Sequence, residues 1–368
     1  MKLRYKITGA VLGIFAVALV ALGLILSHDA PCGSAPALAA DAAAMQAITY
    51  RCYGPPAVLK LERVPKPVVA DDAVLVRVRA ASLNPLDWHY MRGTPYLLRL
   101  EAGIGRPSEA RMGVDFAGSV EAVGRNVTRY KAGDEVFGGR DGAFAEYVSV
   151  REARALAHKP ANMSFAQAAA VPIAGITALQ ALRDKGHIHA GEKVLINGAS
   201  GGVGTFAVQI AKSYGAEVTG VCSTTNVALV RALGADHVID YTRDDFSAGG
   251  EQYDLIIDNV GNRPLLAYRR IMTPKGILVM VGGGRSGDWI GFMIAPLEGL
   301  VLSRLGSRKF EPFLAELNKE DLAFLGDLMQ QGKLTPFVDR SYSLARLPEA
   351  MAYLEAGHAR GKVVVTVP

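Results

Sequence analysis

One glycine-rich stretch constrains this chain more than any other: Lys193 to Gly204, which reads KVLINGASGGVG. Three apolar residues, Val194 to Ile196, precede the small residues, and apolar positions at helical spacing follow them. This pattern predicts a strand, a tight turn and the start of a helix. The turn has the spacing of a dinucleotide-binding fingerprint, with Ala199 in place of the first glycine. Small residues there let the backbone approach a pyrophosphate, whose charge the free N–H groups at the helix start would face.

The sequence after this turn alternates between short apolar strands and helical segments, with strands expected at 217–222, 238–240, 253–258 and 276–281. Such alternation predicts a parallel, doubly wound sheet covered on both faces. Ligands of these sheets lie beyond the carboxyl ends of the strands. The residues expected to contact a dinucleotide there are Ala199, Ser200, Gly201, Gly202, Val203, Gly204, Ser223, Asn226, Asn259, Gly282 and Gly283.

Length and composition set the outer limits. The chain has 368 residues, of which 50% are hydrophobic, so two domains with additional segments are expected. The net charge is +5 and the basic residues are spread out, which argues against nucleic acid as a partner. The three cysteines, Cys32, Cys52 and Cys222, have no metal-ligand spacing, so neither a zinc site nor a disulfide framework is predicted.

The N-terminal segment carries Lys2, Arg4 and Lys6, followed by twenty uncharged residues from 7 to 26. At about 1.5 Å per residue, this length matches a bilayer core of roughly 30 Å. We therefore expect a single-pass membrane anchor, with a linker up to residue 45. A cleaved signal peptide with export of the chain is the second interpretation, and a buried helix is the third. The basic residues favour an inside N-terminus, whereas nicotinamide cofactors are a cytoplasmic resource, so the side of the membrane stays open.

From about residue 46 onward, short β-like runs separated by turns predict a compact β-rich domain. Several strings then appear together: NPLDW (84–88), GVDFAGSV (113–120), VPIAGITA (171–178), LGADHVIDY (233–241) and GHARGKVVV (357–365). With them, the chain resembles the zinc-independent, zeta-crystallin-like quinone oxidoreductase branch of the medium-chain dehydrogenase/reductase superfamily. Within that branch it is most similar to membrane-associated quinone oxidoreductase homologues and to reticulon-interacting mitochondrial oxidoreductases.

The resemblance implies an α/β fold with a GroES-like domain at 46–170 and a Rossmann domain at 171–305. Residues 306–368 would complete the GroES-like domain, and residues 1–45 would form the anchor and linker. It also implies that Asn84 and Asp87 face the reaction centre as the nearest catalytic candidates, with no proton donor assigned. The further cofactor contacts that it implies are Thr177, Tyr241, Arg360 and Lys362.

Departures from the zinc alcohol dehydrogenases bear on the chemistry. Those enzymes have a ligand cysteine where Ser82 to Pro85 stands here, and a ligand histidine where Gly113 to Asp115 stands. Residues 93–113 contain no cysteine, so the four-cysteine lobe has no counterpart either. Without zinc there is no Lewis acid to polarise an alkoxide. Reduction of an electron-poor quinone or α,β-unsaturated carbonyl is therefore the expected reaction, with a small lipophilic acceptor as substrate.

The end of the second strand, Cys222 to Asn226, indicates the cofactor. It holds no carboxylate that would bind a ribose 2′-hydroxyl and repel a 2′-phosphate. Ser223 and Asn226 offer hydrogen-bond donors instead, although Ser223 could simply cap the next helix. We expect NADPH, with NADH as the alternative because no basic residue stands at Asn226.

Two other functions stay open: a non-catalytic sensor or adaptor that binds NADPH, and an alcohol dehydrogenase activity that would need a metal. The unusually apolar stretch 288–306 would serve core packing or a homodimer contact, line the acceptor pocket, or touch lipid. His89 lies near the expected site in sequence, but a lone histidine is more often a packing or surface residue.

Overall fold

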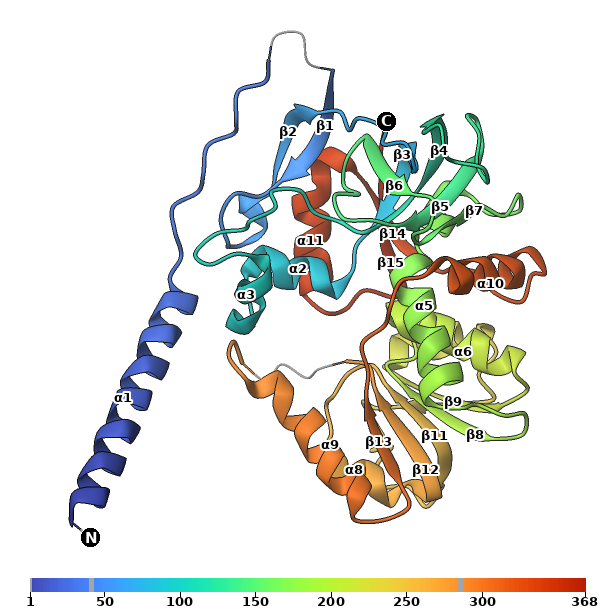
Figure 1. The fold of residues 1–368 in the computed structure, drawn as a ribbon. Helices are drawn as coiled ribbons and strands as arrows, with labels where there is room; N and C mark the ends of the chain where they lie inside the picture. Colours follow the sequence, from blue (N-terminus) through green and yellow to red (C-terminus); the bar gives the residue numbers. More distant parts are fainter. Residues whose placement is uncertain (1, 40–42, 283–286) are drawn as a thin grey trace.

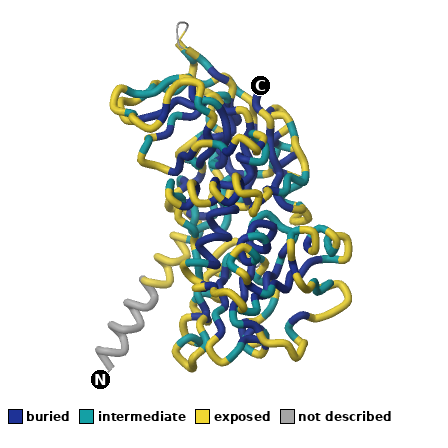
Figure 2. The backbone as a smooth tube through the Cα atoms, turned by 90° about the vertical axis from the view of Figure 1, so that its right-hand side faces the viewer, coloured by how far each residue is buried: buried dark blue, intermediate teal, exposed yellow. Residues whose placement is uncertain are grey.

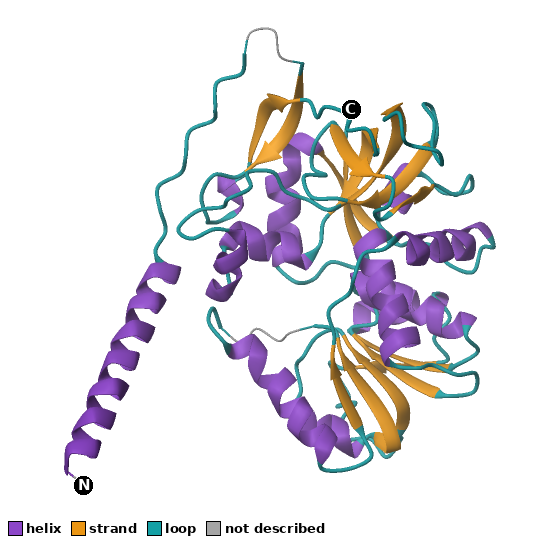
Figure 3. Ribbon diagram, viewed as in Figure 1, coloured by secondary structure: helices purple, strands orange, loops and turns teal. Residues whose placement is uncertain are grey.

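The computed structural model of this chain describes residues 2–39, 43–282 and 287–368, and for residues 2–14 it describes the backbone alone. Two lobes are built on separate β-sheets, and helix α1 extends away from both (Figure 1). Strands form the centre of each lobe, and most of the helices lie on the outside (Figure 3). The expected combination of a β-rich lobe and a doubly wound α/β lobe is confirmed.

The α/β lobe contains a six-stranded sheet in the order β10-β9-β8-β11-β12-β13, and each neighbouring pair is parallel. The order reverses between β8 and β11, which is the point where such sheets bind ligands. The sixth strand, β13, follows helix α9 and was not predicted from the sequence. The strands are β8 Lys193–Asn197, β9 Glu217–Cys222, β10 His237–Asp240, β11 Tyr253–Asp258, β12 Met272–Met280 and β13 Lys309–Pro312. The helices are α6 Gly202–Ser213, α7 Val227–Ala232, α8 Leu265–Arg270 and α9 Ile294–Arg304.

The β-rich lobe contains a seven-stranded sheet in which the last two strands of the chain join strands from its first half. This order, β14-β15-β3-β4-β5-β7 with β6 paired to β3, brings the end of the chain beside β3. Its strands are β3 Ala73–Ser82, β4 Asp115–Val123, β5 Glu135–Gly139, β6 Tyr147–Arg151, β7 Leu156–His158, β14 Val338–Ser343 and β15 Lys362–Thr366. Strands β1 Ala44–Thr49 and β2 Lys60–Pro65 form a separate antiparallel pair.

Helix α5, Pro172–Gln180, lies between the two lobes and contacts α6, α10 and strands of the β-rich sheet. Nearly all of its residues are buried, in keeping with a sequence that is apolar on every side. Its packing fixes the position of the α/β sheet relative to the β-rich sheet. The remaining helices are α2 Pro85–Arg92, α3 Arg99–Ala102, α4 Phe165–Ala169, α10 Lys319–Gln330 and α11 Leu347–Glu355.

The N-terminal segment forms helix α1, Lys2–Ser27, but the prediction of a membrane anchor over residues 7–26 is wrong. In the part of the chain that the structure describes, no helix combines the length and apolar character that crossing a bilayer requires. The helix instead ends in the protein: Leu26 is buried, and the Trp289 ring lies against Gly23. Its described side chains before Leu26 are mostly exposed (Figure 2).

Arg99 holds the end of α1. Its guanidinium donates to the Leu26 and His28 carbonyl oxygens at 2.9 and 3.1 Å and pairs with Asp29 at 2.8 Å. The ring of Tyr53 stacks on the same guanidinium at 4.4 Å. A cation at the carboxyl end of a helix also interacts favourably with the helix dipole. These contacts fasten part of the predicted linker to the β-rich lobe.

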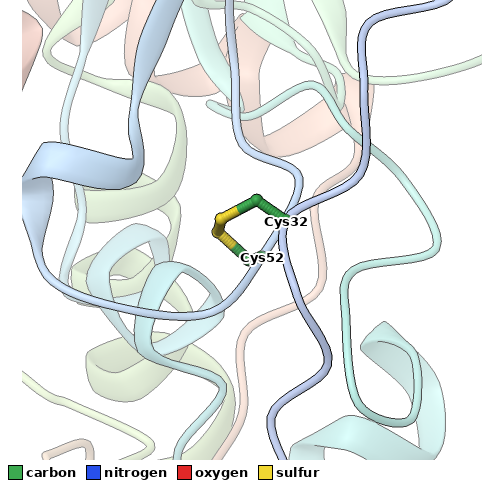
Figure 4. The surroundings of a disulfide bond; sticks show 2 residues. All are labelled: Cys32 and Cys52. Atoms are coloured by element: carbon green, nitrogen blue, oxygen red, sulfur yellow. A yellow bond between two sulfur atoms is a disulfide. The ribbon is translucent and has the colours of Figure 1, made fainter.

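A disulfide joins Cys32 to Cys52 and fixes the same segment beside β1 (Figure 4). The prediction that the chain has no disulfide framework did not anticipate this bond, because the spacing of the three cysteines shows no pairing pattern. Cys222, by contrast, is free and buried. The disulfide and Arg99 together tie residues 28–33 to the β-rich lobe.

Replacing Arg99 with alanine should destabilise the fold by about 2–4 kcal/mol, because it leaves buried carbonyl oxygens without donors. The urea midpoint of unfolding measures this. Arg125→Ala is the matched control, since Arg125 makes an exposed pair with Asp71 that is worth less than about 1 kcal/mol. Equal midpoint shifts for the two variants would contradict the role given to Arg99.

Candidate active site

The dinucleotide turn is shaped by close backbone contacts. Strand β8 ends at Asn197, and Gly198 takes a positive φ of 75° that turns the chain into α6. A Cβ on Gly204 would lie 2.1 Å from the Gly198 carbonyl oxygen, so only glycine fits there. The amides of the first turn of α6, which begins at Gly202, have no partners within the helix. The turn therefore has the backbone shape and the free donors that a pyrophosphate needs.

Two buried side-chain oxygens, beyond the ends of the strands on either side of β8, have no partners in the described part of the chain: Oδ1 of Asn226 after β9 and Oδ1 of Asn259 after β11. The Asn226 amide group donates to the Ser200 and Ser223 hydroxyls at 3.2 and 3.1 Å, which links the dinucleotide turn to the end of β9. The Asn259 amide group donates to the Asn197 carbonyl oxygen at 3.0 Å. An unpaired buried acceptor is costly, so both oxygens fit a ligand that donates hydrogen bonds.

The other expected cofactor residues lie in several different elements. Tyr241 follows β10 and is exposed, and Thr177 is buried in α5. A Cβ on Gly282 would lie 2.1 Å from the Asn259 carbonyl oxygen, so Gly282 packs closely against the end of β11. Gly283 lies outside the described residues. The turn contains Ala199, Ser200 and Gly201. Val203 is in the first turn of α6, and Ser223 directly follows β9.

A buried polar cluster in the β-rich lobe is centred on Lys362. Its ammonium donates to Oδ1 of Asn84 at 2.6 Å and to the Leu83 carbonyl oxygen at 3.0 Å, and it lies 3.4 Å from Oδ2 of Asp115. Asp115 also accepts from the Ser82 hydroxyl at 3.0 Å and from the Asn84 amide at 2.9 Å. Burial lowers the pKa of Lys362, and the Asp115 carboxylate opposes that shift.

Asp87 lies beside this cluster in the first turn of α2. Its carboxylate accepts the Asn84 backbone N–H at 2.7 Å and so caps the helix. Burial raises the pKa of Asp87 to about 7, and the Asn84 hydrogen bond opposes that shift. The charge of Asp115 raises this pKa further, whereas the Lys362 ammonium lowers it. Asp87 thus titrates near neutral pH.

His89 is not placed as a proton donor. Its Nδ1 lies 2.8 Å from the Thr94 carbonyl oxygen, which can only accept, so Nδ1 carries the hydrogen. Burial lowers the pKa of the imidazole. In the neutral ring, Nε2 is an acceptor.

The segment 360–362 crosses the dinucleotide turn. The Gly361 amide donates to the Ser200 carbonyl oxygen at 2.8 Å, and Gly361 forms a parallel bridge with Gly201. Arg360, expected to contact the cofactor, instead has a half-exposed side chain paired with Asp339 at 3.4 Å. Lys362, expected to do the same, directs its ammonium into the polar cluster.

Comparisons with known proteins agree with this arrangement. The family model described as an alcohol dehydrogenase GroES-like domain matches residues 70–161, and the one described as a zinc-binding dehydrogenase matches residues 233–365. The chloroplastic quinone-oxidoreductase QR1 of Triphysaria versicolor is 34% identical over 87% of this chain and 98% of its own length. The chain belongs to the medium-chain dehydrogenase/reductase family.

Two further members of this family are informative. A chloroplastic NADPH-dependent alkenal/one oxidoreductase of Arabidopsis thaliana is 36% identical over 87% of this chain and 79% of its own length. The structure of a quinone oxidoreductase from Coxiella burnetii has a TM-score of 0.78, with 34% identity, and covers 89% of this chain and 100% of its own. The quinone oxidoreductase relatives confirm the branch that the sequence motifs indicated.

Metal ligands are the point on which this family divides. Among the described residues, no group of three or more histidine, cysteine, aspartate or glutamate side chains could hold a metal ion. The two stretches where zinc enzymes of the family carry ligands, Ser82 to Pro85 and Gly113 to Asp115, meet here through the hydrogen bond between Ser82 and Asp115. Sequence reasoning missed Asp115 as a member of the site, although its place in the GVDFAG string was the signal for it.

Gly204→Ala should abolish close packing of α6 on the turn, because the added Cβ would meet backbone that cannot move aside. We expect affinity for a nicotinamide dinucleotide to fall at least about tenfold, measured by calorimetric titration. Gly250→Ala is the control, since nothing lies within 4 Å of its Cβ position. Unchanged affinity in the Gly204 variant would argue against a pyrophosphate site in this turn.

Asp87→Asn should change the pH dependence of stability. The pKa of an unfolded aspartate is 3.8, whereas the pKa of Asp87 in the folded chain is about 7. Between these two pH values, the carboxyl group is deprotonated in the unfolded chain and still protonated in the folded chain. Asp87 therefore costs stability progressively across that window. The variant should gain on the order of 1 kcal/mol relative to wild type between pH 5.5 and pH 8, measured by urea unfolding. Asp71→Asn, an exposed control, should show no such gain.

Proposed function

We propose that this chain is an NADPH-dependent oxidoreductase that transfers a hydride to a quinone or an α,β-unsaturated carbonyl acceptor. The observation that carries the proposal is the pair of unpartnered, buried oxygens of Asn226 and Asn259 beside the dinucleotide turn. Hydroxyl and amide groups of a nicotinamide dinucleotide are donors that would satisfy such oxygens. The residues present therefore fit the cofactor.

The bound cofactor would supply the hydride, and the protein would hold it in place. The first amides of α6 would bind the pyrophosphate, and Asn259 would lie toward the nicotinamide half at the end of β11. Ser223, Asn226 and Tyr241 would surround the adenosine half at the ends of β9 and β10. No carboxylate follows β9 directly in the chain, which supports NADPH. The carboxylate of Asp240, at the end of the neighbouring strand β10, accepts from the Thr224 hydroxyl.

The polar cluster supports the proposed class of acceptor. Asn84, Asp115 and Lys362 satisfy one another, so their arrangement offers an alcohol no group that would remove its proton. A quinone or an enone is already electron-poor and needs mainly to be held in register with the cofactor. The names of the relatives, quinone oxidoreductase and alkenal/one oxidoreductase, support the same acceptor class.

Oxidation of NADPH in the presence of a panel of quinones and enones tests the proposal. We expect turnover with at least one acceptor class and a preference for NADPH over NADH. Tight binding of NADPH without turnover of any acceptor would contradict the proposal and indicate a non-catalytic NADPH-binding protein.

Ser223→Asp tests the cofactor preference separately. The new carboxylate at the end of β9 would repel a 2′-phosphate and accept a ribose 2′-hydroxyl. NADPH affinity should fall at least about tenfold while NADH affinity holds or rises, measured by titrating nucleotide fluorescence. Ser307→Asp adds the same charge at an exposed residue and should change neither affinity. A loss of both affinities in the Ser223 variant would point to disruption of the turn rather than to recognition of the phosphate.

A further inference from the structure

Lys362 was expected to bind the cofactor, but its surroundings indicate a different role. The side chain is almost fully buried and points away from solvent into the β-rich lobe. Its stem passes the start of α6, where a Cβ built on Gly202 would lie 3.3 Å from Lys362 Cδ. Its head lies among Asn84, Leu83 and Asp115. An ammonium has three hydrogens, and three acceptors surround this one, so it has none left for a ligand.

Asn84 is held by the same contacts. Its Oδ1 accepts from Lys362, and its Nδ2 donates to Asp115. Because Lys362 can only donate and the Asp115 carboxylate accepts, the two ends of the amide cannot be exchanged. The second hydrogen of Nδ2 has no other partner among the described residues. Lys362 thus fixes both the position and the orientation of Asn84.

The negative charge of Asp115 in the cluster is compensated by the ammonium of Lys362. Zinc enzymes of the family use a metal cation, with ligands where Ser82 to Pro85 and Gly113 to Asp115 stand here. Here an ammonium from β15 lies beside that carboxylate and carries the positive charge. A buried carboxylate without a counter-charge would be strongly unfavourable. The cation of this site therefore comes from the chain itself.

We propose that Lys362 is a positioning residue that serves as the built-in cation of the reaction centre, orienting Asn84 toward the acceptor without binding the cofactor. This inference rests on the proposed function. The segment that carries Lys362 also contacts the dinucleotide turn through Gly361 and Ser200. The start of β15 therefore connects the cofactor site to the acceptor site.

Lys362→Met tests the role, because methionine fills similar volume without charge. We expect NADPH affinity to stay within about threefold of wild type and acceptor kcat/KM to fall at least about tenfold. Lys66→Met, in an ion pair with Glu121 at the surface of the same lobe, is the control and should change neither. A tenfold loss of NADPH affinity with normal acceptor kinetics would make Lys362 a cofactor ligand and overturn the proposal.

The double variant Asp115→Asn with Lys362→Met distinguishes two roles of Lys362: orienting Asn84 and compensating the charge of Asp115. Removing both charges should restore the melting temperature that Lys362→Met lowers, because no unpaired buried carboxylate is left. We expect the double variant to fold even if Lys362→Met alone does not. Acceptor kcat/KM should stay low, because Asn84 is still unfixed. Recovery of kcat/KM together with the melting temperature would show that Lys362 only balances charge.

A readout without turnover distinguishes failure of this proposal from failure of the proposed function. The groups that act on Asp87 are Asp115, Lys362, Asp141 and the Asn84 backbone N–H. Lys362→Met should raise the pKa of Asp87 and Asp115→Asn should lower it, both followed by the infrared carboxyl band. If the wild-type chain reduces no acceptor but these shifts occur, the proposed function fails while the placement of the ammonium holds. Absence of the shifts would overturn the proposal itself.

Discussion

The contact between the segment 360–362 and the dinucleotide turn is the interaction that connects that turn to the buried polar cluster. Gly361 donates to Ser200 in the α/β lobe, and the next residue inserts its ammonium beside Asp115 in the β-rich lobe. Burying an ammonium is costly unless several acceptors surround it. Asn84, Leu83 and Asp115 supply them, so the last strand of the chain is held at one position between both sites.

Close packing of the backbone determines the shape of the dinucleotide turn. Parallel strands whose order reverses between β8 and β11 bring Asn197, Cys222 and Asp258 to one edge of the sheet. The turn after Asn197 can pack there only because Gly204 has no side chain. Unpartnered oxygens at this edge would be a defect in a purely structural protein, whereas in a binding site a ligand satisfies them.

Local sequence patterns predicted most of the α/β lobe, because the alternation of strands and helices and the glycine spacing each depend on residues close together in the chain. The N-terminal segment shows where such patterns fail. Its apolar run predicts a helix correctly, but a long apolar helix does not reveal what lies beside it. Arg99, more than seventy residues away in the chain, binds the carbonyl of Leu26. Cys32 and Cys52 form a disulfide for a similar reason: the fold, and not their spacing, brings them together.

By itself the sequence determined the doubly wound sheet, the dinucleotide turn and the lack of a ligand cysteine within 82–85 and a ligand histidine within 113–115, since each depends on residues close together or on the identity of single positions. Only the tertiary structure decided that the Lys362 ammonium lies among Asn84, Leu83 and Asp115, and that Arg360 lies at the surface. Both residues are adjacent to the same glycine, and the direction of each side chain depends on how β15 pairs with β3. That pairing joins strands about 280 residues apart, a separation over which local sequence preferences carry no information.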